Sequence, residues 1–205
     1  MPKSVTTTLA TSLRRLGREF KPNRLAYLSL TASNEALLCG ALASLLHEAY
    51  ADQGHTQVRR EWSRSSSDAS FDVAVLTDGV PVALIEAKAA MSFDLVQGGD
   101  FPKNAVLEDL DRLKGVDFEG ERYALLFVTH PHEIPRHEYD VAMPTSYTEE
   151  MRRHGAIEPA RVDNAIRRFH GAVGNPPLVA TGRISAGTAF DVDVSIIYLL
   201  VSVPG

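Results

Sequence analysis

Long hydrophobic runs and cysteine are almost absent from this sequence. No stretch of about eighteen or more consecutive apolar residues occurs, and the N-terminus has no apolar segment of the signal-peptide kind. We therefore expect a soluble, cytoplasmic protein with no membrane partner. The one cysteine, Cys39, excludes an internal disulfide, and it lies in an apolar helical pattern where a structural role is expected.

Several motifs of well-defined chemistry are also missing. The sequence has no internal repeat, P-loop, Gly-x-Gly-x-x-Gly segment or Ser/His/Asp nucleophile motif, so repeat architectures, nucleotide folds and acyl transfer lack their usual signals. The net charge of −5 gives no overall positive footprint for nucleic acid. With 205 residues, 44% of them hydrophobic, the chain 1–205 is expected to form a single globular domain.

Two apolar, strand-like runs organise the rest of the prediction. They span 71–76 and 80–85, and Thr77-Asp78-Gly79 separates them. A short Asp-Gly connection between runs of this kind predicts a β-hairpin. An antiparallel hairpin brings the start of its first strand beside the end of its second, so side chains at those two positions should meet.

Two acids and a lysine occupy those positions. Asp72 stands near the start of the first strand, and Glu86 and Lys88 close the second, two residues apart and therefore on the same face. Neighbouring carboxylates raise each other's pKa unless a cation lies between them, and a few oxygen ligands suit Mg²⁺ shared with a phosphate substrate. Lys88 could then hold the attacking water and offset charge in the transition state. The alternative is a surface ion pair between Glu86 and Lys88.

This arrangement resembles a known enzyme family. Asp72, followed at the end of the next strand by Glu86-Ala87-Lys88, is similar to the signature of the PD-(D/E)xK nuclease superfamily, which has the restriction-endonuclease-like fold. The family's proline is missing, because Phe71 precedes Asp72. The resemblance implies that Asp72, Glu86 and the backbone carbonyl of Ala87 hold Mg²⁺, with Mn²⁺ as a substitute, and that Lys88 is the catalytic lysine.

A further carboxylate, Glu35, opens the helix that is predicted from about Asn34 to Ala49 with Ser33 as its N-cap. Glu35 projects onto the apolar stripe of this helix. Such an acid either stabilises the first turn of its own helix or points at something inside the domain. Many members of the resembled superfamily carry a glutamate on the first core helix that reaches the metal site, which makes Glu35 a candidate further ligand or base.

Arginines near the proposed site are expected to contact nucleic acid. The strand predicted over 56–62 and the turn after it carry Arg59, Arg60 and Arg64. Glu61, beside them, is either an extra carboxylate for the site or the partner in a salt bridge.

Charged residues of both signs lie on the helix predicted over 104–114. Arg112 and Lys114 either contact phosphate or belong, with Asp109 and Asp111, to a mixed and solvated face.

The order of the predicted elements gives the fold class. A loop is expected over 89–103, and the nearly continuous apolar run 123–128 is typical of a strand covered on both faces. Together with the hairpin and its flanking helices, this order predicts an α/β fold with a central mixed sheet flanked by helices. It agrees with the restriction-endonuclease-like fold, and the resemblance covers about 31–128 as a nuclease-like core.

The last third of the chain, 144–205, is predicted as an extension of that core. It contains two helices, about 146–153 and 158–169, and a hairpin of strands 178–184 and 190–203 across Ser185-Ala186-Gly187-Thr188. The apolar last strand either extends the core sheet or forms a homodimer interface.

The only histidine cluster contains His130, His132 and His137 with Glu133. Pro131 and Pro135 lie among these residues and indicate an irregular chain. The segment is therefore predicted as a surface loop in preference to a zinc site.

The sequence therefore predicts a Mg²⁺-dependent nuclease that hydrolyses phosphodiester bonds, with DNA as the favoured substrate and RNA as the alternative. The competing hypothesis is a catalytically silent nuclease-fold module for nucleic-acid binding or complex assembly. The two differ in geometry, because only the enzyme needs Asp72 and Glu86 within reach of one metal ion.

Overall fold

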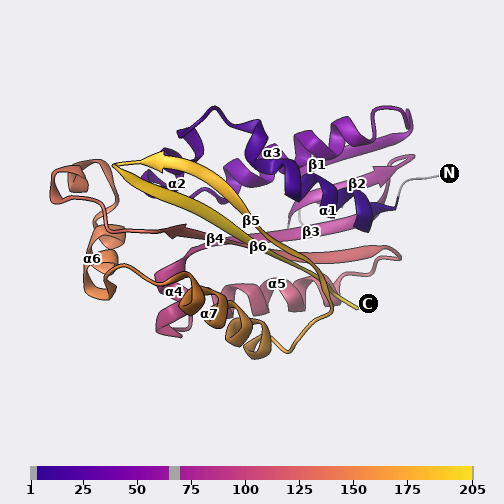
Figure 1. Cartoon of the computed structure of the whole chain (residues 1–205). Coiled ribbons are helices and arrows are strands. Elements are labelled where there is room, and N and C mark those ends of the chain that lie inside the picture. Colours follow the sequence, from indigo (N-terminus) through magenta and orange to yellow (C-terminus); the bar gives the residue numbers. More distant parts are fainter. Residues whose placement is uncertain (1–3, 65–69, 205) are drawn as a thin grey trace.

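The computed structural model describes residues 4–64 and 70–204. A six-stranded sheet runs through the molecule in the order β1-β2-β3-β4-β6-β5 (Figure 1). Neighbouring strands are antiparallel except for the central pair, β3 and β4, which is parallel. The strands are β1 (Thr56–Trp62), β2 (Phe71–Thr77), β3 (Val80–Met91), β4 (Glu121–Pro131), β5 (Leu178–Ala189) and β6 (Val192–Ser202).

Helices cover both faces of the sheet. In Figure 1, α1, α2 and α3 lie on one face, α4, α5 and α7 lie on the other, and α6 lies at one end. The predicted α/β class, with a central mixed sheet flanked by helices, is confirmed. The helices are α1 (Val5–Arg15), α2 (Arg24–Thr31), α3 (Glu35–Ala49), α4 (Ser92–Gln97), α5 (Lys103–Gly115), α6 (Thr145–His154) and α7 (Pro159–Ala172), with 3₁₀ segments η1 (Leu16–Glu19) and η2 (His137–Ala142).

The hairpin of β2 and β3 is confirmed as the sequence predicted it. Thr77 pairs with Val80, so the loop contains only Asp78 and Gly79. Both have left-handed backbone conformations, with φ of +52° and +79°. Asp-Gly suits such a loop because glycine enters this region without strain and aspartate tolerates it better than most residues.

The centre of the core is β4, which lies between β3 and β6. Every residue of β4 from Tyr123 to Pro131 is buried. The buried strand expected over 123–128 is therefore confirmed, but it is longer than predicted. His130 and Pro131, which were expected in a surface loop, belong to this strand, and His130 is fully buried.

The segment 89–103 is not the loop that the sequence predicted. β3 continues to Met91, and α4 follows directly. The Asp94 carboxylate of α4 accepts a hydrogen bond of 2.8 Å from the Met91 backbone N–H, which satisfies one free donor at the start of the helix. The expected loop is limited to residues 98–102, between α4 and α5.

The C-terminal hairpin extends the core sheet along β4, but its turn is not at 185–188. The chain reverses at Phe190 and Asp191, both with positive φ, and Ala189 pairs with Val192. Gly187 lies inside β5 with φ of +92°, and a Cβ there would stand 2.5 Å from Asn23 Oδ1. This glycine therefore serves a close approach of Asn23 and does not form the turn.

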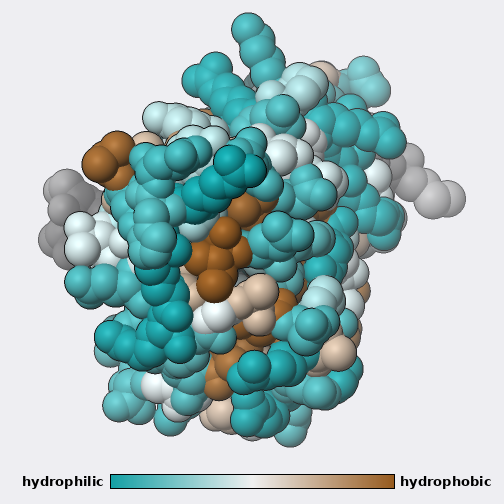
Figure 2. Space-filling model, turned by 60° about the vertical axis from the view of Figure 1, so that its left-hand side comes forward, coloured by the Kyte–Doolittle hydropathy of each residue, from teal (hydrophilic) through white to brown (hydrophobic). Residues whose placement is uncertain are grey.

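None of the helices in the described parts of the chain combines the length and the apolar composition that a membrane span requires. On the face shown in Figure 2, hydrophilic side chains predominate and the apolar ones gather towards the middle.

Candidate active site

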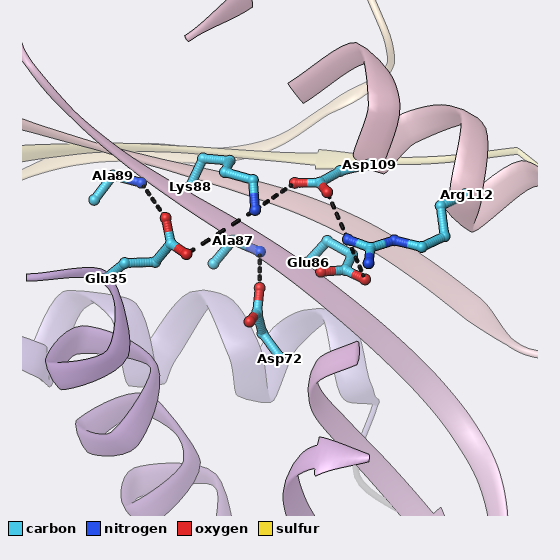
Figure 3. Close-up of polar contacts among 8 residues, drawn as sticks. All are labelled: Glu35, Asp72, Glu86, Ala87, Lys88, Ala89, Asp109 and Arg112. Carbon is cyan, nitrogen blue, oxygen red and sulfur yellow. Dashed lines mark hydrogen bonds and ion pairs between the residues drawn. The ribbon is translucent and has the colours of Figure 1, made fainter. Parts of the chain in front are cut away.

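The β2–β3 hairpin places Asp72 beside the end of β3. Val73 pairs with Ile85, so one further step in the same register sets Asp72 opposite Glu86. The Ala87 backbone N–H donates a hydrogen bond of 2.7 Å to Asp72 Oδ2. The structure thus brings Asp72 against the Glu86-Ala87-Lys88 segment, as Figure 3 shows.

Glu35 reaches the same strand from the start of α3. Its Oε2 accepts a hydrogen bond of 2.9 Å from the Ala89 backbone N–H, and its Oε1 lies 4.0 Å from Lys88 Nζ. Burial raises the pKa of Glu35, while the bond from Ala89 opposes the shift. The acid on the apolar stripe of α3 therefore points into the domain and joins the other predicted site residues.

These contacts have a local structural cause. The pairing of β2 with β3 ends at Val73 and Ile85, so the N–H groups of Ala87 and Ala89 lie beyond the part of β3 that β2 pairs. Asp72 and Glu35 supply the missing acceptors with their carboxylates. In Figure 3, both acids approach β3 from one side, whereas Asp109 and Arg112 lie on the other.

Glu86 is the most deeply buried acid of the group, with 2% of its side chain exposed. The Oε1 atom of Glu86 forms an ion pair with Arg112 Nη2 at 2.9 Å. The geometry of this contact is not that of a hydrogen bond, and Oε1 accepts none from the described residues. Burial raises the pKa of Glu86 to about 9, against the opposing effect of Arg112 and with the help of the nearby Asp72 and Asp109 carboxylates. Glu86 therefore carries a proton near neutral pH unless a further cation approaches it.

Lys88 lies between two acids on different helices. Its Nζ is 3.2 Å from Asp109 Oδ2 on α5 and 4.0 Å from Glu35 Oε1 on α3. Burial lowers the pKa of Lys88, but the attraction of Asp109 and Glu35 outweighs burial and the net shift is upward. Lys88 is thus a fixed positive charge, and 23% of its side chain remains exposed.

Asp109 and Arg112 lie among these charged side chains, and the sequence prediction did not place them there. Asp109 is buried and contacts both Lys88 and Arg112 Nη2, the latter at 2.6 Å. The solvated face predicted for α5 is correct for Asp111, which pairs with Lys114, and wrong for Asp109. Asp109 lies three residues after Val106 on the buried stripe of α5, and that spacing was the available signal.

The arginines expected to contact nucleic acid lie at the edge of the sheet, on or just after β1. Arg59 donates to Gln57, and Arg64 donates a hydrogen bond of 2.9 Å to the Asp117 carbonyl. Arg60 pairs at 3.7 Å with Glu61, whose side chain is 75% exposed. Glu61 is therefore the salt-bridge partner and not a further carboxylate of the site.

Cys39 is buried in α3, close to Asp72 and Glu35. Burial, together with the nearby Asp72 and Glu35, raises the pKa of its thiol to about 12. A thiol of this kind is unreactive, which agrees with the structural role that the sequence predicted.

The histidine cluster is a packed pair with separate partners. His130 Nδ1 lies 3.1 Å from Ser92 Oγ and His132 Nε2 lies 3.1 Å from Ser195 Oγ, with the two rings 5.1 Å apart. Across residues 4–64 and 70–204, no group of three or more His, Cys, Asp or Glu side chains is already arranged as a metal site.

No family model, no curated protein and no solved structure matches this chain. Any assignment of function therefore depends on the charged cluster itself, which we define as Glu35, Asp72, Glu86, Lys88, Asp109 and Arg112 (Figure 3).

Proposed function

We propose that this protein is a divalent-metal-dependent nuclease of the PD-(D/E)xK type, with a restriction-endonuclease-like fold, which acts in the cytoplasm and hydrolyses phosphodiester bonds in DNA. RNA is the alternative substrate. The observation that carries the proposal is the juxtaposition of Asp72 with Glu86-Ala87-Lys88 at the end of one hairpin. Two carboxylates and a lysine at one point are the groups that metal-dependent phosphodiester hydrolysis requires.

The charge of the cluster fits a divalent cation. Four carboxylates face two cationic side chains, so the fully ionised cluster has a formal charge of −2. Glu86 Oε1 is buried and accepts no hydrogen bond from a described residue, and the pKa of Glu86 is raised to about 9. A divalent ion would offset this charge and favour the ionised form of Glu86.

The residues have separate roles in this proposal. Asp72, Glu86 and the carbonyl of Ala87 would hold Mg²⁺ or Mn²⁺, and Glu35 is the candidate further ligand or base. When bound, such an ion would supply Lewis-acid polarisation of the phosphoryl oxygen and lower the pKa of a coordinated water. Lys88, fixed by Asp109 and still partly exposed, positions the attacking water and stabilises the negative charge that develops on the phosphate.

The second candidate function is a silent module for nucleic-acid binding or assembly, and one observation favours it. The carboxylates of Asp72 and Glu35 already complete the hydrogen bonding of β3, and Lys88 already has Asp109 as an ion-pair partner. In that case the cluster stabilises the end of the hairpin and performs no chemistry.

Cleavage assays separate the two candidates. Wild type, Lys88→Ala and Glu86→Gln are incubated with single-stranded, duplex and branched DNA and with RNA, in Mg²⁺, in Mn²⁺ and in a chelator. The nuclease predicts metal-dependent cleavage that both variants lose. Lys114→Ala is the matched control, because Lys114, like Lys88, pairs with an aspartate of α5, but its partner Asp111 is exposed and lies outside the cluster. Equal cleavage by Lys88→Ala and wild type removes Lys88 from the mechanism, and no cleavage of any substrate favours the silent module.

A further inference from the structure

An aromatic pocket of about 220 Å³ opens beside the charged cluster. We use this name for the cavity whose walls include Trp62, Phe71 and Phe118. The rings of Trp62 and Phe71 are stacked, with centroids 6.5 Å apart. Gly115 also lines it, and a Cβ on Gly115 would meet no atom of residues 4–64 and 70–204 within 4 Å, so the described part of this wall is open. The pocket has room for one flat ring system.

The aromatic pocket shares one residue, Arg112, with the charged cluster. Phe71 directly precedes Asp72 in β2. Arg112 lines the pocket and also lies 2.9 Å from Glu86 Oε1, and its guanidinium stands 5.9 Å from the centre of the Phe71 ring. A ligand in the pocket is therefore a direct neighbour of any phosphate that binds at the cluster.

The charges that line the pocket favour an anionic ligand. Among the described residues, its lining contains two arginines, Arg64 and Arg112, and no carboxylate. Another pocket, about 320 Å³, lies by Ala89 at the other end of the cluster, but Asp94 and Glu150 line it. Stacked aromatic rings with arginines at their edge suit a flat base that carries an anionic backbone, and the acidic pocket does not.

We propose that the aromatic pocket binds one unpaired nucleobase of the substrate, next to the phosphate that is cleaved. The proposal rests on the nuclease function and narrows its substrate class to single-stranded or locally unpaired nucleic acid. A base inside a duplex is stacked on its neighbours and has to be flipped out before a pocket can accept it. A single strand offers its bases without that cost.

Trp62 makes the proposal directly measurable, because it is the only tryptophan of the chain. Its fluorescence is titrated with a short single-stranded oligonucleotide in a chelator, so that binding is measured without cleavage. The probes for comparison are the same strand with stable abasic units in place of its bases, and a duplex of the same sequence. We expect the base-bearing strand to quench Trp62 and the abasic strand to bind about 5- to 140-fold more weakly without quenching.

A variant that fills the pocket tests the location. Gly115→Leu adds an apolar side chain at the open wall and removes none of the aromatic rings. We expect it to keep the thermal stability of wild type and to lose quenching and strand affinity. Tyr27→Ala is the control, because Tyr27 is an exposed aromatic residue on α2, next to β5 at the opposite edge of the sheet. Unchanged quenching in Gly115→Leu, or equal quenching by duplex and single strand, overturns the proposal.

Cleavage in Mg²⁺ distinguishes this proposal from the nuclease function on which it rests. If wild type cleaves the abasic strand as fast as the base-bearing strand, the base pocket is refuted and the nuclease stands. If the base-bearing strand quenches Trp62 and no strand is cleaved, the nuclease is refuted and base binding stands.

Discussion

Asp109 connects the two cations of the cluster, so its replacement tests whether the cluster is a coupled unit. Asp109→Ala removes the partner of Lys88 at 3.2 Å and of Arg112 at 2.6 Å. Loss of one member of a buried ion pair costs about 3–5 kcal/mol. Lys88 and Arg112 both reach solvent and each keeps a second acid, Glu35 or Glu86, so we expect a smaller loss of about 2 kcal/mol.

Urea unfolding followed by circular dichroism measures this loss. The slope of free energy against urea should stay unchanged, because the surface exposed on unfolding stays the same. For a chain of this length, a loss of about 2 kcal/mol lowers the melting temperature by about 4–8 °C. The control is Asp111→Ala, two positions along the same helix, because the Asp111 side chain is 77% exposed and its replacement should change stability by less than about 0.5 kcal/mol. Equal effects of the two substitutions would refute the coupled cluster.

Three further outcomes are expected. Mg²⁺ should raise the melting temperature of wild type and leave that of Glu86→Gln unchanged in differential scanning fluorimetry. At a Mg²⁺ concentration of a hundred times Kd, the stabilisation of wild type should be about 2.7 kcal/mol. Equal shifts in the melting temperatures of wild type and variant would contradict the metal site. Burial lowers the pKa of His130 to about 4, whereas in the unfolded chain the same histidine takes up a proton below about pH 6.5. The free energy of unfolding should therefore fall by about 3 kcal/mol from pH 6.5 to pH 4. His130→Leu should flatten that fall in urea titrations, and replacement of exposed His55 should not. Gly187→Ala should destabilise the fold by about 1–3 kcal/mol, because φ is +92° and the new Cβ meets Asn23, whereas Gly99→Ala, at an open position, should be neutral in the same unfolding experiment.

The parts of the fold that the sequence predicted depend on short-range signals. Asp78-Gly79 between two apolar runs specified the β2–β3 hairpin and its two-residue loop, and with it the approach of Asp72 to Glu86. The apolar run from Tyr123 specified a strand buried on both faces. In both cases the pattern within a few residues already determines the structure.

The parts that could not be predicted depend on contacts between distant segments. Gly187 indicated a turn, but it is required by Asn23, more than a hundred and fifty residues earlier in the chain. Asp109 is buried between two cations, Arg112 on its own helix and Lys88 on β3, and the pattern of α5 gives no sign of Lys88. Local composition contains no information about such partners, so a glycine was assigned to the wrong turn and a buried acid to the solvent.

The early end of the β2–β3 pairing has a consequence for self-association. Beyond Ile85, the edge of β3 that faces β2 has no strand partner among residues 4–64 and 70–204, and an unpaired strand edge is where a second chain can add to a sheet. Asp72 and Glu35 occupy the amide groups that such a chain would need, and they place negative charge along its path. The same two acids would thus oppose aggregation through this edge, whether or not the cluster is catalytic.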